Sequence, residues 1–123
     1  NVARELGHRI ITIDEVKERG IKDVVDETIK LATNGTDGIY FSLDIDVMDP
    51  SQVMSQKAPE FWGLTMDEMF HALRRITREK IIGCDISEYT PDYDFNGMGA
   101  QFCARVAAEF LGGIALRKRD KKA

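Results

Sequence analysis

The sequence predicts an α/β fold, a three-layer α/β/α sandwich in which helices cover both faces of a parallel sheet. Helical and strand-like segments alternate along the 123 residues in the order α-β-α-β-α-β-α. The strand-like segments are almost continuously apolar, which is typical of parallel strands buried on both faces. Because no linker, repeat or low-complexity segment interrupts the chain, residues 1–123 are predicted to belong to a single domain without an internal boundary.

The first two predicted elements are the end of a helix and a strand. Residues 2–6 have helical character, and Gly7 is the type of residue that ends a helix. The segment 8–13 is rich in β-branched side chains and is predicted to be a strand. A helix that ends at Asn34-Gly35 follows, and its buried face is marked by residues at helical spacing, namely Ile21, Val24, Val25, Thr28, Ile29 and Ala32.

The second half of the chain contains two further strands and two helices. A strand is predicted over residues 39–45, where β-branched and aromatic side chains follow a turn-forming segment. Thr65 and Glu68 have the spacing of a capping box, which starts a helix. Residues 81–86 form the third strand candidate. The apolar stripes of the two helices consist of Met66, Met69, Phe70, Leu73 and Ile76, and of Phe102, Val106, Phe110, Leu111 and Ile114.

The composition argues against several classes of protein. A formal net charge of −4 and a pI near 5.2 argue against nucleic acid as a partner, because phosphate binding needs a basic surface. No apolar stretch reaches the roughly 20 residues that span a bilayer, and no signal-peptide pattern opens the chain, so no membrane partner is expected. Cys84 and Cys103 lack metal or redox spacing and are expected to be small, buried, reduced thiols. These features predict a cytoplasmic protein.

Three carboxylates lie within six residues at the end of the predicted strand 39–45 and just after it, at Asp44, Asp46 and Asp49. Side chains alternate along a strand, so Asp44 and Asp46 are expected on one face, with about 7 Å between their Cβ atoms. Two carboxylates that close repel unless a cation or several N–H donors offset their charge, and oxygen ligands suit Mn²⁺, Mg²⁺ or Ca²⁺. The alternative is a solvated turn or an Asx-turn. For Asp49, which precedes Pro50, a turn is the favoured interpretation.

Acidic residues also lie at the end of the next predicted strand, at Asp85 and Glu88, with Ser87 between them. The carboxyl ends of parallel strands meet at one rim of the sheet, where ligands bind in such folds. The two groups of acids therefore predict a single site. A chain that opens on the end of a helix, with a first strand that has no earlier partner, also looks like the second half of a larger unit.

Three parts of the chain, residues 42–50, residues 58–60 with 63–65, and residues 83–91, resemble the C-terminal signatures of the ureohydrolases, the arginase and agmatinase family of binuclear manganese enzymes. The resemblance covers nearly the whole chain and favours the agmatinase branch, because Glu60 follows Pro59 and Gly83-Cys84-Asp85 precedes Glu88. It implies an arginase-like fold, of which this chain is the C-terminal part.

The resemblance also implies roles for individual residues. Asp44 would bind both Mn²⁺ ions and Asp46 one of them, and the ions would share a hydroxide as nucleophile. Glu88 would act as the catalytic and substrate-binding carboxylate that pairs the guanidinium group, and Glu60 would shape the substrate entrance. The alternatives are an exposed acid at a strand end for Glu88 and an ordinary loop salt bridge for Glu60.

The sequence departs from the family pattern in two ways. Ala58 stands where agmatinases usually carry a threonine, and Phe61-Trp62-Gly63 stands where a glycine pair is common, with a cation added at Lys57. The family's metal-binding histidines and its Asp-x-His-x-x-x-Asp motif lie in an N-terminal half that has no counterpart here. His8 and His71 are expected to be structural.

The sequence therefore predicts a metal-dependent hydrolase that cleaves a guanidino substrate, agmatine or a related compound, to an amine and urea. A formimino or guanidino-acid hydrolase of the same family is the first alternative, and a non-catalytic interaction or regulatory module is the second. The expected partners are a small guanidino substrate, an N-terminal half that carries the histidine ligands, and further copies in a homo-oligomer. The chain alone is expected to be inactive.

Overall fold

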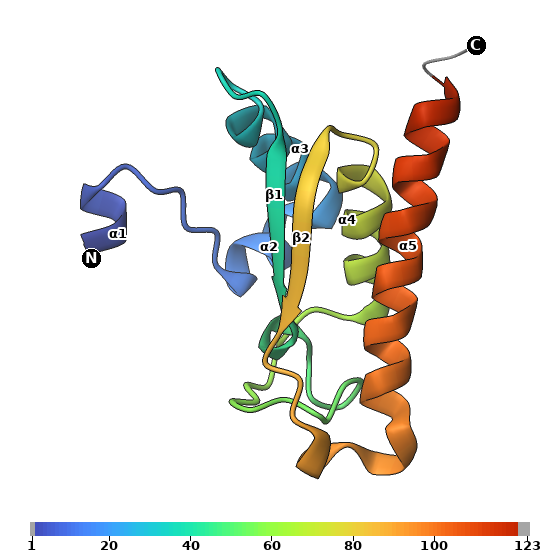
Figure 1. The fold of residues 1–123 in the computed structure, drawn as a ribbon. Helices are drawn as coiled ribbons and strands as arrows, with labels where there is room; N and C mark the ends of the chain where they lie inside the picture. Colours follow the sequence, from blue (N-terminus) through green and yellow to red (C-terminus); the bar gives the residue numbers. More distant parts are fainter. Residues whose placement is uncertain (1, 121–123) are drawn as a thin grey trace.

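The computed structural model describes residues 2–120 and contains a two-stranded parallel sheet (Figure 1). The strands are β1 (Ile39–Asp44) and β2 (Ile81–Ser87), and their register runs from Ile39 opposite Ile81 to Asp44 opposite Ser87. Both strands therefore end at the same level. Three helices pack beside the sheet, α3 (Ile21–Ala32), α4 (Met66–Ile76) and α5 (Met98–Asp120).

The two faces of β1 differ in burial. Phe41 and Leu43 point toward the helices and join the core, whereas Tyr40, Ser42 and Asp44 are exposed. The core lies between β1, α4 and α5, with a second cluster between α3 and α4. The sequence predicted strands that are buried on both faces. Within residues 2–120 the helices cover one face of these strands, so buried and exposed residues alternate along β1 instead.

The predicted capping box starts α4. The Glu68 N–H donates to Thr65 Oγ1 at 3.3 Å, and the Thr65 N–H donates to Glu68 Oε2 at 2.8 Å. Lys17 adds an ion pair to Glu68 at 2.7 Å. The predicted buried stripes of α3 and α4 are confirmed in outline by Val24, Val25, Ile29, Met69, Leu73 and Ile76. In α5 the stripe is narrower than predicted, since Leu111 is 71% exposed.

The predicted strand over residues 8–13 is wrong. The helical end before it is confirmed as α1 (Val2–Glu5), but residues 8–12 are irregular and Ile13 begins a new helix, α2 (Ile13–Arg19). Thr12 caps this helix by accepting a hydrogen bond from the Glu15 N–H at 3.3 Å. A threonine followed three residues later by glutamate is a helix-start signal, and it outweighs the β-branched character of the segment.

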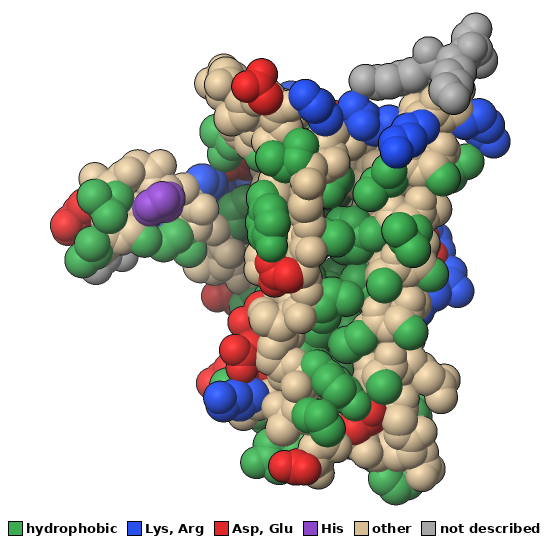
Figure 2. Space-filling model, in the orientation of Figure 1, with side chains coloured by type: hydrophobic (Ala, Val, Ile, Leu, Met, Phe, Trp, Pro, Cys, Tyr) green, Lys and Arg blue, Asp and Glu red, His purple; other side chains and the backbone are tan. Residues whose placement is uncertain are grey.

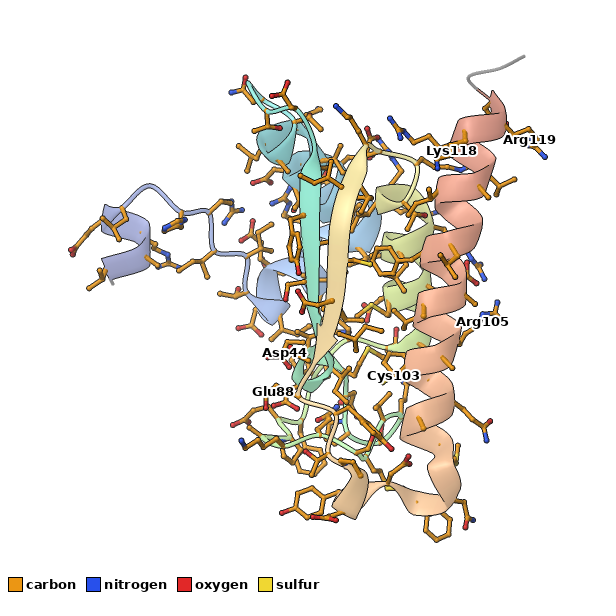
Figure 3. All side chains as sticks on the ribbon, in the orientation of Figure 1. Asp44, Glu88, Cys103, Arg105, Lys118 and Arg119 are labelled. Atoms are coloured by element: carbon orange, nitrogen blue, oxygen red, sulfur yellow. The ribbon has the colours of Figure 1, made fainter. Side chains whose placement is uncertain are left out.

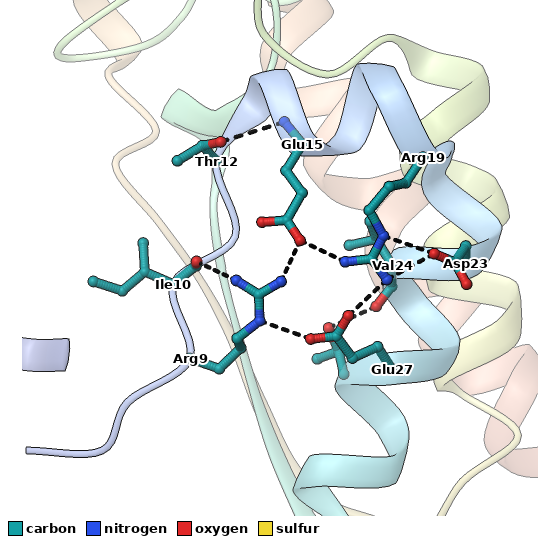
Figure 4. A network of polar contacts seen from close by, with 9 residues as sticks. Arg9, Ile10, Thr12, Glu15, Arg19, Asp23, Val24 and Glu27 are labelled. Carbon is teal, nitrogen blue, oxygen red and sulfur yellow. Dashed lines mark hydrogen bonds and ion pairs between the residues drawn. The ribbon is translucent and has the colours of Figure 1, made fainter.

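A network of charges joins the segment before α2 to α2 and α3 (Figure 4). Arg9 pairs with Glu15 of α2 and, at 2.7 Å, with Glu27 of α3. Arg19 pairs with Glu15, Asp23 and Glu27. Hydrogen bonds from Arg9 and then Arg19 hold the pKa of Glu27 below its ordinary value. Isolated surface pairs contribute little, but five linked charges fix the course of the chain into α2.

The prediction of two buried thiols is wrong for Cys84, which is exposed on β2, a strand that has an open edge within the described sheet. Cys103 on α5 is half-buried, and burial raises the pKa of its thiol. Within the described part of the chain, none of the helices is both long and apolar enough to cross a lipid bilayer.

Close packing of α5 against the end of α4 depends on Gly113, where a Cβ would lie 2.0 Å from Thr77 Oγ1. We expect Gly113→Ala to lower the free energy of unfolding by about 1–3 kcal/mol, because buried Thr77 has no room to move aside. The matched control is Gly112→Ala, whose added methyl would meet nothing within 4 Å. That change should stabilise the helix by about 0.5–1 kcal/mol. Urea denaturation of both variants checks the difference, and equal effects would contradict the assigned contact.

Candidate functional site

The predicted site residues Asp44 and Glu88 come together at the carboxyl end of the sheet. Asp44 is the last residue of β1 and lies opposite Ser87, so Glu88 follows directly after its partner strand. Figure 3 shows both residues at this end of the sheet. Figure 2 shows acidic side chains gathered below the strands on the open face, with basic atoms beside them. The parallel register therefore produces the acidic rim that the sequence predicted.

Asp44 and Asp46 are related by a turn, and the strand spacing expected for them is wrong. The strand ends at Asp44, and residues Ile45–Val47 form the 3-10 helix η1, which Asp44 caps by accepting the Asp46 N–H at 2.9 Å. The turn is held from below by Ile45 and Met48, both fully buried. The position of Asp46 is therefore set by the burial of Ile45 and Met48 in the core, and not by the alternation of side chains along a strand.

The Asp46 carboxylate also holds the loop that follows. Its two oxygens accept the N–H groups of Lys57 and Ala58, each at 3.0 Å. A carboxylate offers about four lone-pair positions. These contacts use one position on Asp44 and two on Asp46, so both retain oxygen lone pairs of the kind that Mn²⁺ or Mg²⁺ binds. The donors thus suit a hard cation in chemical type.

The donors are too few to hold a metal ion on their own. Among residues 2–120 no group of three or more histidine, cysteine, aspartate or glutamate side chains is placed to bind a metal. His8 is exposed beyond α1, and His71 is exposed on α4 with its Nδ1 3.1 Å from the Asp67 carbonyl oxygen. Neither histidine joins Asp44 and Asp46 in such a group, so further ligands would have to come from outside the described residues.

Asp49 closes the base of the loop between residues 50 and 62. Its carboxylate accepts the Ser51 N–H at 3.0 Å and the N–H groups of Trp62 and Gly63 at 3.0 and 3.3 Å. Hydrogen bonds from the Ser51 hydroxyl and N–H, then from the two later residues, lower the pKa of Asp49. The turn predicted for this residue is confirmed.

Two acidic side chains at the rim have no partner among the described residues. Glu88 is exposed and has φ 62°, a left-handed conformation that costs a non-glycine residue about 1–3 kcal/mol. Glu60 is exposed and lines a hollow of about 330 Å³ together with Asp46. Within residues 2–120 no hydrogen bond or ion pair engages either carboxylate, so the loop salt bridge considered for Glu60 does not form there. Both carboxylates remain open to a ligand.

Asp85 lies apart from this rim. It accepts the Tyr40 hydroxyl at 2.8 Å and the Ser42 hydroxyl at 2.9 Å on the open face of the sheet. The hydrogen bond to Asp85 raises the pKa of Tyr40. Sequence reasoning grouped Asp85 with Glu88, but the two-residue period of β2 places it one step back from the strand end. The signal that could have revealed the cluster of Tyr40, Ser42 and Asp85 is the pair of hydroxyl residues at alternate positions of β1.

Trp62 is a site residue that sequence reasoning did not assign. Its φ of 71° is left-handed, and for a bulky side chain this conformation costs about 1–3 kcal/mol. The turn around Asp49 accounts for it, since the N–H groups of Trp62 and Gly63 both point to the same carboxylate oxygen. The next residue must be glycine, because a Cβ on Gly63 would lie 2.4 Å from the Asp49 nitrogen. The dipeptide Trp62-Gly63 at the end of a loop was the available signal.

Known proteins match this chain over nearly its whole length. It is 31% identical over 116 residues to an agmatinase of Photorhabdus laumondii, covering 94% of this chain and 37% of that protein. It is 33% identical over 122 residues to the proclavaminate amidinohydrolase of Streptomyces clavuligerus, covering 97% of this chain and 37% of that protein. The chain thus spans little more than a third of the length of these relatives.

Solved structures and a family model lead to the same assignment. The formimidoylglutamase of Bacillus subtilis matches with a TM-score of 0.88 and 30% identity, over 94% of this chain and 36% of that one. This similarity confirms the predicted α/β fold with a parallel sheet as part of an arginase-like fold. The sequence model of the arginase family matches residues 1–112. The chain therefore belongs to the arginase family.

Proposed function

We propose that this chain is the C-terminal part of a metal-dependent hydrolase that cleaves a guanidino or related amidine substrate, releasing an amine and, from a guanidino compound, urea. The observation that carries the proposal is the carboxyl end of the sheet, where Asp44 ends β1, Asp46 follows it in η1 and Glu88 follows β2, with carboxylate oxygens free to bind ligands. Membership of the arginase family supports it. Because the chain spans 37% of its agmatinase relative, the activity is proposed for the complete protein.

Asp44 and Asp46 would hold the metal, with the remaining ligands supplied by an N-terminal half. A bound Mn²⁺ pair supplies a water of lowered pKa that can attack an unreactive guanidinium carbon near neutral pH. The Asp46 N–H fixes the orientation of the Asp44 carboxylate. Two backbone N–H donors fix the orientation of the Asp46 carboxylate. Both are thus held in place before the substrate arrives, which lowers the cost of assembling the site.

Glu88 would orient the substrate. A carboxylate and a guanidinium group form two parallel hydrogen bonds, which fix both the position and the plane of the reacting carbon. The strained backbone at Glu88 supports this role, because such strain persists where the surrounding structure enforces it and concentrates at functional sites. Its direct sequence neighbour Ser87 is paired to Asp44, so the substrate head would lie beside the metal ligands.

The substrate is proposed to be a guanidino compound with an uncharged or anionic tail. Lys57 is exposed next to the Asp46 contact, and Ala58 has no hydroxyl to offer. A second amine in the substrate, as in agmatine, would meet a like charge there. Relatives at 30–33% identity are an agmatinase, a formimidoylglutamase and a proclavaminate amidinohydrolase, so identity alone does not select among substrates.

The test is a substrate panel with the complete protein and added Mn²⁺. We expect urea release from guanidino acids or neutral guanidines with a kcat/KM at least about tenfold above that for agmatine, the scale of discrimination one pocket contact supplies. Formiminoglutamate, followed by formamide release, tests the formimino alternative. Highest activity on agmatine would contradict the specificity, and no release from any compound would favour a non-catalytic module. The 123-residue chain alone should release no urea.

A further inference from the structure

Two exposed aromatic side chains stand beside the proposed site. Phe61 is 83% exposed and Trp62 is 62% exposed, and neither belongs to a core cluster of the described residues. Trp62 adopts this position with a left-handed backbone that favours glycine. A large aromatic residue that gains little burial in a strained position is not explained by the stability of the described fold. Such a residue points to a role in binding.

The aromatic pair forms one wall of the 330 Å³ hollow that Asp46 and Glu60 also line, which we call the Trp62 hollow. The segment before α2, α2 itself, η1 and the loop after Glu60 all contribute to it. Its remaining lining is apolar and consists of Ile11, Ile13, Val16, Val47, Gly63 and Leu64. A volume of this size matches the smaller ligand pockets of proteins.

Charges in and around the Trp62 hollow distinguish its two ends. Asp46 belongs to the proposed metal pair and also lines the hollow, so the hollow adjoins the acidic rim, and Glu60 adds a carboxylate to the lining. Lys17 lies with its Nζ 6.0 Å from the centroid of the Trp62 ring, and its ion pair with Glu68 at 2.7 Å holds it there. A positively charged group at the aromatic wall would therefore meet a cation already in place. An uncharged apolar group would meet only apolar and aromatic surface.

We infer that the Trp62 hollow is a subsite for the tail of the substrate, and that this tail is uncharged and apolar, with an aromatic ring or a branched alkyl group. The inference rests on the proposed function, since it takes the cationic amidine head to lie at the acidic rim. The metal site and Glu88 set the direction of the ligand, with the cationic head at the rim, which Asp46 joins to the hollow, and the apolar tail against Trp62. The aromatic wall then replaces the water that the tail leaves behind.

The kinetic test compares 4-phenylbutylguanidine with butylguanidine on the complete protein. We expect kcat/KM to be at least about tenfold higher for the phenyl compound, the scale on which an apolar pocket discriminates, with the difference mainly in KM. Trp62→Gly should remove most of that preference while relieving backbone strain, so loss of folding cannot account for the result. The matched control is Phe95→Ala, which removes another exposed aromatic ring that does not line the hollow.

A binding measurement separates this inference from the proposed reaction. Trp62 is the one tryptophan of the 123-residue sequence, so the fluorescence difference between the protein and its Trp62→Phe variant isolates its signal. Saturable quenching by 4-phenylbutylguanidine but not by agmatine would support the subsite even if no compound were hydrolysed. Hydrolysis of guanidines without a preference for the phenyl tail, or without that quenching, would overturn the subsite and leave the proposed function standing.

Discussion

Asp44→Asn in the complete protein is expected to lower Mn²⁺ affinity and urea release together, by about 100-fold or more. A ligating carboxylate contributes charge as well as position, and even the groups that support metal ligands are worth about 10–100-fold. The fold should persist, because an asparagine Oδ1 can still accept the Asp46 N–H that Asp44 accepts at 2.9 Å. Metal content measured by mass spectrometry, alongside turnover, checks the prediction.

Asp46→Asn should lower metal affinity too, but with a structural effect that Asp44→Asn lacks. Both oxygens of Asp46 accept backbone N–H groups, and an amide nitrogen facing one of them would leave that donor unpaired. The loop at Lys57 should therefore loosen, visible as faster hydrogen exchange there. Asp37→Asn, at the other end of β1, is the control for charge alone. Full metal content in both Asp44 and Asp46 variants would refute their assignment as ligands.

Glu88→Gln is expected to lower kcat/KM by about 2 kcal/mol or more, roughly 30-fold, because a charge-assisted hydrogen-bond pair to the substrate becomes a neutral one. Glutamine keeps the shape of the side chain and meets the same left-handed backbone, so the strain at φ 62° is unchanged. Metal content should stay at the level of the unmodified protein, which distinguishes Glu88 from Asp44. Glu60→Gln should have the smaller effect of a residue at the entrance. Unaltered kinetics in Glu88→Gln would end its proposed role.

Elements with one dominant signal were predictable from the sequence. The helices α3 and α4 show helical apolar spacing and, for α4, a capping box. Strand β1 shows β-branched and aromatic residues after a turn, and β2 is rich in isoleucine. The segment 8–13 failed because two signals compete there. Its β-branched side chains favour a strand, whereas the cap formed by Thr12 and Glu15 favours a helix, and a local hydrogen bond decided the outcome.

The sequence predicted which strand ends carry the site, but it did not predict how the individual side chains are held. Parallel pairing of β1 and β2 brings Asp44 and Glu88 to one edge, as their positions at strand ends predict. The turn that carries Asp46 depends on the burial of Ile45 and Met48, a tertiary effect that strand periodicity does not contain. The conformation of Trp62 likewise follows from a carboxylate thirteen residues earlier.

The closure of the loop at Asp49 has an evolutionary consequence. Besides the carboxylate contacts, the Asp49 N–H donates to the Leu64 carbonyl at 2.9 Å and the Leu64 N–H to the Val47 carbonyl at 2.8 Å. The base of the loop is thus fastened independently of most of the side chains within it. Because the loop holds Asp46 through the backbone N–H groups of Lys57 and Ala58, exposed side chains of the loop can change without displacing the carboxylates beside it. Such a loop lets a lineage change its substrate while its reaction chemistry stays constant.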